Sequence, residues 1–324
     1  MAETSGHGFN RIDVHHHIAP PEYIRSLSPE ARMPPPLAGW TPERSIETMD
    51  EGGVDFSLTS ITLPGLWFGD TGEARRMARL CNDYAAQLRA DHPNRFGMFV
   101  NLPLPDIDGC LAEIEYGMDE LGADGVVLFT SYGDVWLGDP AYDAVYAELN
   151  RRKCIVYVHP MTPECCENIL PGIPDAVVEY QTDTSRAIAR VVFGGMAAKF
   201  PDIRFIWSHG GGTMPFLIHR YEKLGALPQS AEAVPDGFMA AAGKFYYDTA
   251  QVANEAAMLA LRAVAGTGNI VYGTDFPFLS ADHHTQGLAA CGVFNADELR
   301  AIDSGNILKW LPQYAARPAW PATA

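Results

Sequence analysis

The sequence predicts a single (β/α)8 TIM barrel with loop insertions, and three observations lead to this fold class. Eight short apolar segments alternate with eight helical segments along the 324 residues. The apolar segments are nearly continuous, as expected for parallel strands that are covered on both faces. Histidine or aspartate side chains stand at the C-terminal ends of several of these segments, and TIM barrels place their functional groups there.

The expected strands and helices follow one another from the N-terminus. The strands are expected at residues 12–18, 54–62, 95–102, 124–130, 154–159, 204–209, 245–249 and 269–275. The helices that follow them are expected at residues 41–53, 73–92, 106–121, 140–152, 182–200, 213–224, 254–265 and 296–311. No second domain is indicated, so residues 1–324 are expected to form one domain with its barrel core at about residues 10–312.

Local signals set several of these boundaries. Thr41-Pro42-Glu43 is typical of a helix start, because a capping threonine precedes a proline in the first turn, and Gly52-Gly53 ends that helix. The pair His283-His284 is expected in a loop after the last strand. Three segments are too long for simple connectors and are expected to be loop insertions, the first of them rich in proline: residues 19–40, 161–180 and 226–243.

Composition and charge exclude several classes of function. The net charge of −17 leaves no basic stripe for phosphates, which argues against nucleic-acid binding. No apolar segment is long enough to span a membrane, and the N-terminus lacks the features of a signal peptide. The six cysteines follow no disulfide framework, so we expect reduced thiols and a cytoplasmic protein.

Five side chains suited to metal binding or proton transfer mark the ends of four expected strands. His15 and His17 are two residues apart, so one strand directs both to the same face, and His16 to the opposite face. His159, His209 and Asp275 end three further strands. A single histidine at a strand end is more often a hydrogen-bonded structural residue than a ligand. Five such groups at corresponding strand ends favour a metal site.

Four motifs together resemble a known family. Ile-Asp-Val-His15-His16-His17, Val-His159-Pro, Ser-His209-Gly-Gly-Gly and Gly-Thr-Asp275-Phe-Pro-Phe resemble the metal-dependent decarboxylases related to amidohydrolases. That group includes aminocarboxymuconate-semialdehyde decarboxylase and the salicylate-type decarboxylases, and the resemblance covers roughly residues 10–312. Two segments, Ser131 to Pro140 and Asn150-Arg151-Arg152, look most like those of 6-methylsalicylate decarboxylases.

The resemblance implies a barrel of the metal-dependent hydrolase type and assigns roles to the strand-end residues. It implies that His15, His17, His159 and Asp275 bind one divalent ion, and these ligands suit zinc best, with manganese as the alternative. His209 matches the family histidine that lies near the metal and acts on bound water or substrate. Hydrolases with a bridged two-metal centre carry a lysine at the end of strand 4. Phe129, Thr130 and Ser131 stand there instead, which favours a mononuclear site.

The implied reaction is the non-oxidative loss of CO2 from a hydroxybenzoate such as 6-methylsalicylate. Protonation of the ring carbon first avoids an aryl carbanion, and the donor must have a pKa near neutrality. His209 meets this condition by its ordinary pKa, and Asp275 is the alternative donor. A metal-dependent hydrolase or lactonase would use the same ligands. A catalytically silent barrel is the third interpretation, and the complete ligand set argues against it.

Substrate contacts and an assembly are also implied by the resemblance. Arg44 lies one position from the family's substrate-carboxylate arginine, and Phe276 and Phe278 are candidate walls for an aromatic ring. Arg220 lies eleven residues after His209, at the offset of a family arginine that enters the neighbouring subunit's site. We therefore expect a homodimer in which Arg220 holds the substrate carboxylate across the interface. The alternative is a surface arginine paired with a helix carboxylate such as Glu222.

Overall fold

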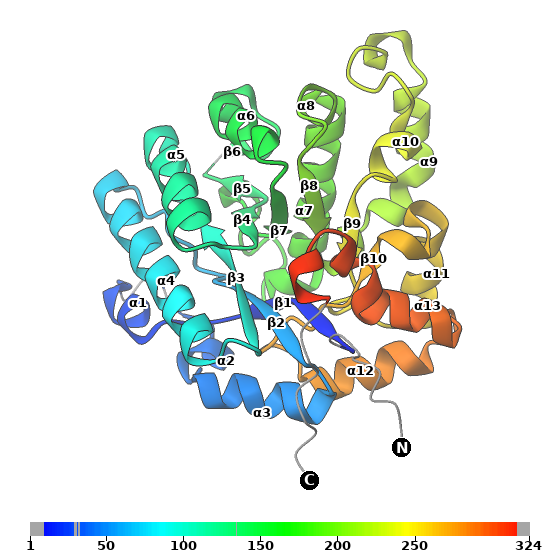
Figure 1. Cartoon of the computed structure of the whole chain (residues 1–324). Helices are drawn as coiled ribbons and strands as arrows, with labels where there is room; N and C mark the ends of the chain where they lie inside the picture. Colours follow the sequence, from blue (N-terminus) through cyan, green and yellow to red (C-terminus); the bar gives the residue numbers. More distant parts are fainter. Residues whose placement is uncertain (1–9, 29–30, 32, 134, 316–324) are drawn as a thin grey trace.

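The structure of the protein is a computed structural model, which describes residues 10–28, 31, 33–133 and 135–315. An eight-stranded parallel sheet has the order β1-β2-β3-β4-β7-β8-β9-β10, with helices around it (Figure 1). The strands are β1 (Ile12–His17), β2 (Phe56–Ser60), β3 (Phe96–Asn101), β4 (Gly125–Phe129), β7 (Ile155–His159), β8 (Arg204–Trp207), β9 (Tyr246–Asp248) and β10 (Ile270–Val271). A separate two-stranded hairpin consists of β5 (Ser131–Tyr132) and β6 (Val135–Trp136).

The first strand and the segment after the last strand complete the barrel. Val14 N donates to Tyr272 O at 3.0 Å, and His17 N donates to Phe276 O at 2.9 Å. His16 also forms a parallel bridge with Phe276. The predicted (β/α)8 barrel is therefore confirmed, and the C-terminal ends of its strands can bring distant residues together.

The helices lie outside the sheet in the sequence order that the alternation predicts. They are α1 (Pro21–Ser26), α2 (Pro35–Ala38), α3 (Pro42–Gly52), α4 (Thr71–Asp91), α5 (Ile107–Glu115), α6 (Asp143–Arg151), α7 (Asp175–Phe193), α8 (Met196–Lys199), α9 (Met214–Gly225), α10 (Phe238–Ala242), α11 (Glu255–Ala265), α12 (Ala281–Ala290) and α13 (Ala296–Arg300). Thr41 caps α3 by accepting a hydrogen bond from Arg44 N, as its sequence predicts.

The strands are buried on both faces, which explains their apolar sequences. One core cluster fills the barrel interior, with Phe56, Phe99 and Tyr157 among its largest side chains, and Tyr314 near the C-terminus packs against Phe56. A larger cluster packs the outer faces of the strands against the surrounding helices. The six residues of β1 are all buried, so its histidines are held between these two layers.

Several local expectations are corrected by the structure. The segment after the last strand contains α12, and His283-His284 lie in this helix rather than in a loop. The α12 sequence lacks a strong apolar stripe, but Ser280 caps it, and Gly52 leaves room for Ala281 to approach α3. The proline-rich segment contains α1 and α2, and α7 begins at Asp175 inside the expected loop 161–180.

The expected closing helix 296–311 is divided. A five-residue π-helical segment, Ala301–Gly305, follows α13 directly, and short 3-10 turns follow it. Asp134, one residue of the 131–140 segment, lies outside the described residues. Among the described helices, none is both long enough and apolar enough to cross a lipid bilayer.

Candidate metal centre and cavity

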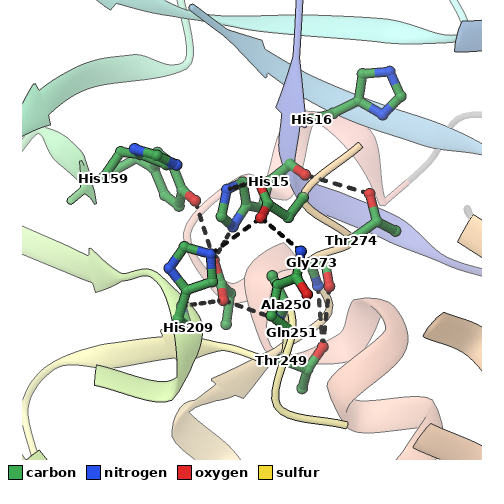
Figure 2. A network of polar contacts seen from close by, with 12 residues as sticks. His15, His16, His159, His209, Thr249, Ala250, Gln251, Gly273 and Thr274 are labelled. Carbon is green, nitrogen blue, oxygen red and sulfur yellow. Dashed lines mark hydrogen bonds and ion pairs between the residues drawn. The ribbon is translucent and has the colours of Figure 1, made fainter. Parts of the chain in front are cut away.

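The ends of three strands bring four histidine and aspartate side chains to one point. His15 and His17 come from β1, His159 ends β7, and Asp275 follows β10. One ligand atom from each of these four buried residues lies within 4.8 Å of the others. Figure 2 shows His15, His159 and His209 converging from different strands. The structure therefore contains a buried His/Asp group that can hold a metal ion.

The contacts inside this group fit a cation. His15 Nε2 lies 3.0 Å from His17 Nε2, and Asp275 Oδ1 lies 3.1 Å and 3.2 Å from these two nitrogen atoms. Asp275 Oδ1 is buried and has no hydrogen-bond partner of acceptable geometry among the described residues. These nitrogen and oxygen atoms direct lone pairs toward one another, and there are too few protons to pair all of them. A positive ion placed between them would relieve this repulsion.

Hydrogen bonds on the far side of two imidazoles fix which nitrogen faces this point. His15 Nδ1 donates to Asp248 Oδ2 at 2.8 Å, because an ionised carboxylate only accepts. His159 Nδ1 likewise donates to Pro160 O at 2.9 Å. In both residues Nε2 is then the atom that faces this point, and it offers a lone pair to a metal ion that takes the place of a proton. Metal-binding histidines commonly have such partners, which orient the ring and select its tautomer.

Burial and nearby charges shift the pKa values in this group in different directions. Burial disfavours the charged form of His15, but the carboxylates of Asp275 and Asp248 outweigh it and raise the pKa of His15 to about 10. Burial lowers the pKa of His17 to about 4, and that of His159 well below its ordinary value. The site thus favours one positive charge among otherwise neutral imidazoles, which suits a cation in place of the proton.

Asp275 is held ionised by its surroundings. Burial alone would raise its pKa, but the positive charge of His15 and the close approach of His17 and His209 hold the pKa of Asp275 well below its ordinary value. Gln251 Nε2 donates to Asp275 Oδ2 at 3.1 Å. The backbone of Asp275 has φ +65°, a left-handed conformation that aspartate tolerates better than most residues.

His209 lies beside the four-residue group, two residues after the end of β8. Its Nε2 is 3.3 Å from Asp275 Oδ2, and its backbone N donates to Asp248 Oδ1 at 2.7 Å. Its Nδ1 is buried without a partner among the described residues. The following glycines, Gly210 to Gly212, have positive φ, so the chain turns sharply here and directs His209 toward Asp275.

His16 points away from the other histidines, as expected for its place on the strand (Figure 2). Its Nε2 lies 2.9 Å from Ser45 Oγ, and its Nδ1 lies 3.3 Å from Asp13 Oδ2. Its ring stacks on Phe276 with centroids 4.7 Å apart. His16 therefore joins β1 to α3 and does not reach the metal-binding group.

A cavity of about 590 Å³ opens onto His159, His209 and Asp275. Its walls come mainly from α7, α9 and α11 and from the loops after β2 and β10. Most of the described residues that line it are apolar, and none of them is a lysine or an arginine. The cavity therefore provides a largely apolar space with its ionisable groups concentrated at one end.

The other residues predicted to contact substrate occupy different places. Phe278 lines the cavity, whereas Phe276 does not, because it is buried against His16. Arg44 is absent from the cavity lining, and its guanidinium donates to Gly39 O at 2.6 Å. Arg220 is exposed on α9 and also lies outside the lining. No ion pair joins it to Glu222 or to any other described carboxylate.

Two residues of the site, Asp248 and Gln251, were not predicted from the sequence. Asp248 is fully buried at the end of β9 and contacts His15, Tyr157 and the backbone of His209. Its position at a strand end, in Tyr-Tyr-Asp248, is the signal that could have identified it. Gln251 has no comparable signal, because it reaches Asp275 from a turn with φ +60°.

Comparison with known proteins is consistent with this geometry. The sequence model of the amidohydrolase family matches residues 12–313. The 6-methylsalicylic acid decarboxylase acuB of Aspergillus aculeatus is 36% identical, and the alignment covers 94% of each chain. The 6-methylsalicylic acid decarboxylase of Penicillium expansum is 35% identical over 94% of this chain and 96% of its own.

One solved structure has a similar fold. It is 5-carboxyvanillate decarboxylase from Novosphingobium aromaticivorans, complexed with manganese and 4-hydroxy-3-methoxy-5-nitrobenzoic acid. Its TM-score is 0.84 at 21% identity, with coverage of 94% of this chain and 96% of that chain. At this identity the likeness concerns the arrangement of the barrel.

Proposed function

Because the chain belongs to the amidohydrolase family, we propose that it is a metal-dependent carboxy-lyase that removes CO2 from a hydroxybenzoate of the 6-methylsalicylate type. Two relatives with 35% and 36% identity along most of both chains carry this activity in their names. The single observation that carries the proposal is the combination of a His/Asp metal-binding group with a largely apolar cavity whose described lining residues include no lysine or arginine. An aromatic ring fits such walls, and its carboxylate needs a cation at the ionisable end.

The ion is proposed to be held by His15, His17, His159 and Asp275. Three imidazoles and one carboxylate suit zinc, which we propose as the native ion, whereas manganese is the ion in the solved relative. When bound, a divalent ion supplies a Lewis-acidic centre that orients an anionic acid and its ortho oxygen. Elemental analysis of protein purified without added metal distinguishes zinc from manganese.

The residues of the chain then supply the proton. Direct loss of CO2 from an aryl ring would leave a carbanion, so the ring carbon must first gain a proton. The C–C bond pair returns to the ring as CO2 leaves and restores aromaticity. His209 lines the cavity, and its Nδ1 has no hydrogen-bond partner among the described residues. Its Nε2 lies next to the ionised Asp275. We therefore assign proton donation to His209 and its orientation to Asp275.

The test is turnover of 6-methylsalicylate by the metal-loaded protein. Decarboxylation yields CO2 and 3-methylphenol in equal amounts, and chromatography with CO2 detection measures both. A hydrolase or lactonase would instead release acid from an ester or lactone substrate without CO2. A protein that binds metal but turns over neither hydroxybenzoates nor lactones would contradict the enzymatic proposal and support a binding role.

We further propose a homodimer in which Arg220 serves the partner's cavity. Arg220 is exposed on α9 and lies outside the lining of its own cavity. Apolar side chains on the same surface face solvent, namely Phe216 at 82% exposure and Leu224 at 40%, one turn to either side of Arg220. Apolar side chains that gather on one exposed surface favour a protein interface. A cation from a second chain would also offset the net charge of −17 for an anionic substrate.

Subunit mixing tests this assembly. Arg220→Ala and His159→Ala chains are each expected to be inactive alone, while hybrid dimers contain one site with all its groups. Random exchange should restore about a quarter of wild-type activity, because half of the dimers are hybrids with one working site. Lys223→Ala, an exposed change on the same helix, is the matched control and should stay active alone. No recovery despite measured subunit exchange would reject the shared site.

A further inference from the structure

The cavity is larger than a monocyclic hydroxybenzoate requires. Even at about 30 Å³ for each non-hydrogen atom, the share of one water molecule in the liquid, the roughly eleven such atoms of 6-methylsalicylate fill only about 330 Å³. The cavity volume is about 590 Å³. Substantial space therefore remains after a ring is placed at the end formed by His159, His209 and Asp275.

One apolar side of the cavity lies along α11. Val252, Ala257, Ala260 and Leu261 form this wall, which we call the α11 branch. Ala257, Ala260 and Leu261 are three and four residues apart, so they share one face of the helix. Two of these three side chains are alanines, so the wall is set back from the cavity. Among the described lining residues, Asp275 is the sole carboxylate, and none of these four wall residues is charged or polar.

The α11 branch begins next to the proposed proton donor. A Cβ added to Gly210 would lie 3.2 Å from Val252 Cγ2 and 3.6 Å from Leu261 Cδ2. The backbone that follows His209 thus packs directly against the branch wall. Gly210 also has φ +63°, a conformation that glycine adopts without strain. A substituent next to the reacting ring carbon can therefore extend from His209 toward α11 along the apolar side chains of Val252 and Leu261.

We infer that the α11 branch binds an alkyl chain at position 6 of the aromatic acid, so that the substrate class extends to 6-alkylsalicylates with chains longer than methyl. This inference rests on the proposed decarboxylase function and names its substrate class. Hydroxyl or charged substituents are disfavoured there, because the branch residues offer them no side-chain hydrogen-bond partner. An alkyl chain instead gains from burial against Val252 and Leu261.

The expected size of the effect follows from burial of methylene groups. Each buried methylene strengthens binding by about fourfold, so two additional methylenes give up to about 15-fold. This binding is present in both the ground state and the transition state, so it raises kcat/KM. We therefore expect 6-propylsalicylate to exceed 6-methylsalicylate in kcat/KM by several-fold, and its dissociation constant to be lower by a similar factor.

The experiment compares 6-methyl-, 6-propyl- and 6-pentylsalicylate on the zinc-loaded protein, with kcat/KM from product formation and Kd from calorimetry. Ala257→Leu and Ala260→Leu fill the branch and should remove the preference for the longer chains while 6-methylsalicylate is still turned over. Ala256→Leu, at an exposed position of α11 outside the cavity lining, is the matched control and should keep the preference. Melting curves check that each variant is folded.

The outcomes separate this inference from the function on which it rests. If 6-methylsalicylate is turned over but 6-propylsalicylate has a lower kcat/KM and binds more weakly than 6-methylsalicylate, the α11 branch is rejected. The decarboxylase function is then still supported. If none of the three acids loses CO2, the proposed function fails. In that case the Kd values still test the α11 branch. Tighter binding of 6-propylsalicylate than of 6-methylsalicylate, lost in Ala257→Leu or Ala260→Leu, would support the branch. Equal binding of the two acids would reject it.

Discussion

Replacing Asp248 with asparagine should weaken metal binding without touching a proposed ligand. Asp248 accepts four hydrogen bonds. Its Oδ1 takes the backbone N–H groups of His209 and Ala250 at 2.7 Å and 3.1 Å. Its Oδ2 takes His15 Nδ1 at 2.8 Å and the Tyr157 hydroxyl at 3.1 Å. In the Asp248→Asn variant, one side-chain oxygen and one NH2 group would have to face the four groups that the two carboxylate oxygens accept from.

The backbone determines how the asparagine amide is oriented. The two backbone N–H groups can only donate, so the amide oxygen must face them, and the NH2 group then faces His15 Nδ1. Two donors cannot pair, which favours the His15 tautomer with its proton on Nε2, the atom that faces the metal position. Loss of such an orienting partner typically weakens metal binding by about 10- to 100-fold.

Competition with a chromophoric chelator measures the metal affinity of Asp248→Asn directly. Tyr157→Phe is the matched control, because it removes one contact to Asp248 and leaves the contact between Asp248 and His15 in place. The control should retain most of the wild-type affinity. A folded Asp248→Asn protein with metal affinity within about twofold of wild type would refute the assignment of the His15 tautomer.

The same geometry leads to four further expected outcomes. Alanine at His15, His17, His159 or Asp275 should each remove the bound metal or abolish turnover, and elemental analysis showing full metal with normal turnover in any two of these variants would reject the ligand set. His209→Ala should keep its metal but slow turnover by about 10²-fold or more, whereas unchanged turnover in His209→Asn would move proton donation to Asp275 or water. His16→Ala should keep its metal, because the ring faces Ser45, but lose about 1–3 kcal/mol of unfolding free energy in denaturant titrations; loss of metal would contradict this orientation. Metal removal by a chelator should lower the melting temperature, since free metal at about 100 times its dissociation constant contributes about 2.7 kcal/mol, and an unchanged melting curve would argue against a tightly bound ion.

The barrel could be predicted because its strands leave a strong sequence signal. Parallel strands that are buried on both faces are largely apolar, and eight mostly apolar segments recur along the chain. The strand-end histidines then follow from topology, since parallel strands of a barrel end on one face. By contrast, α12 has two histidines and a glycine among ten residues and is held by packing against α3, a contact that its own sequence does not reveal.

The details of the site depended on contacts distant in sequence. Asp248 contacts His15 across 233 residues of sequence, and a single aspartate after a strand has many other uses. The register of β1 against β2 shifts between Asp13 and His16, and simple alternation does not foresee such a shift. Asp13 stabilises this segment by accepting hydrogen bonds from the backbone N–H groups of His15 and Thr274. Thr274 is distant in sequence but lies beside β1, where the barrel closes.

The chemistry and the selectivity of the site come from different parts of the chain. The metal-binding group and His209 are set by strand ends, whose positions are fixed by the closed sheet. The cavity walls come largely from α7, α9 and α11, which can change side chains without moving a strand. Substitutions such as Ala257→Leu should therefore alter substrate choice at unchanged metal content. Asp248→Asn should instead lower metal content and leave substrate choice unchanged. Measurement of both quantities on both variants tests whether the barrel separates the two roles in this way.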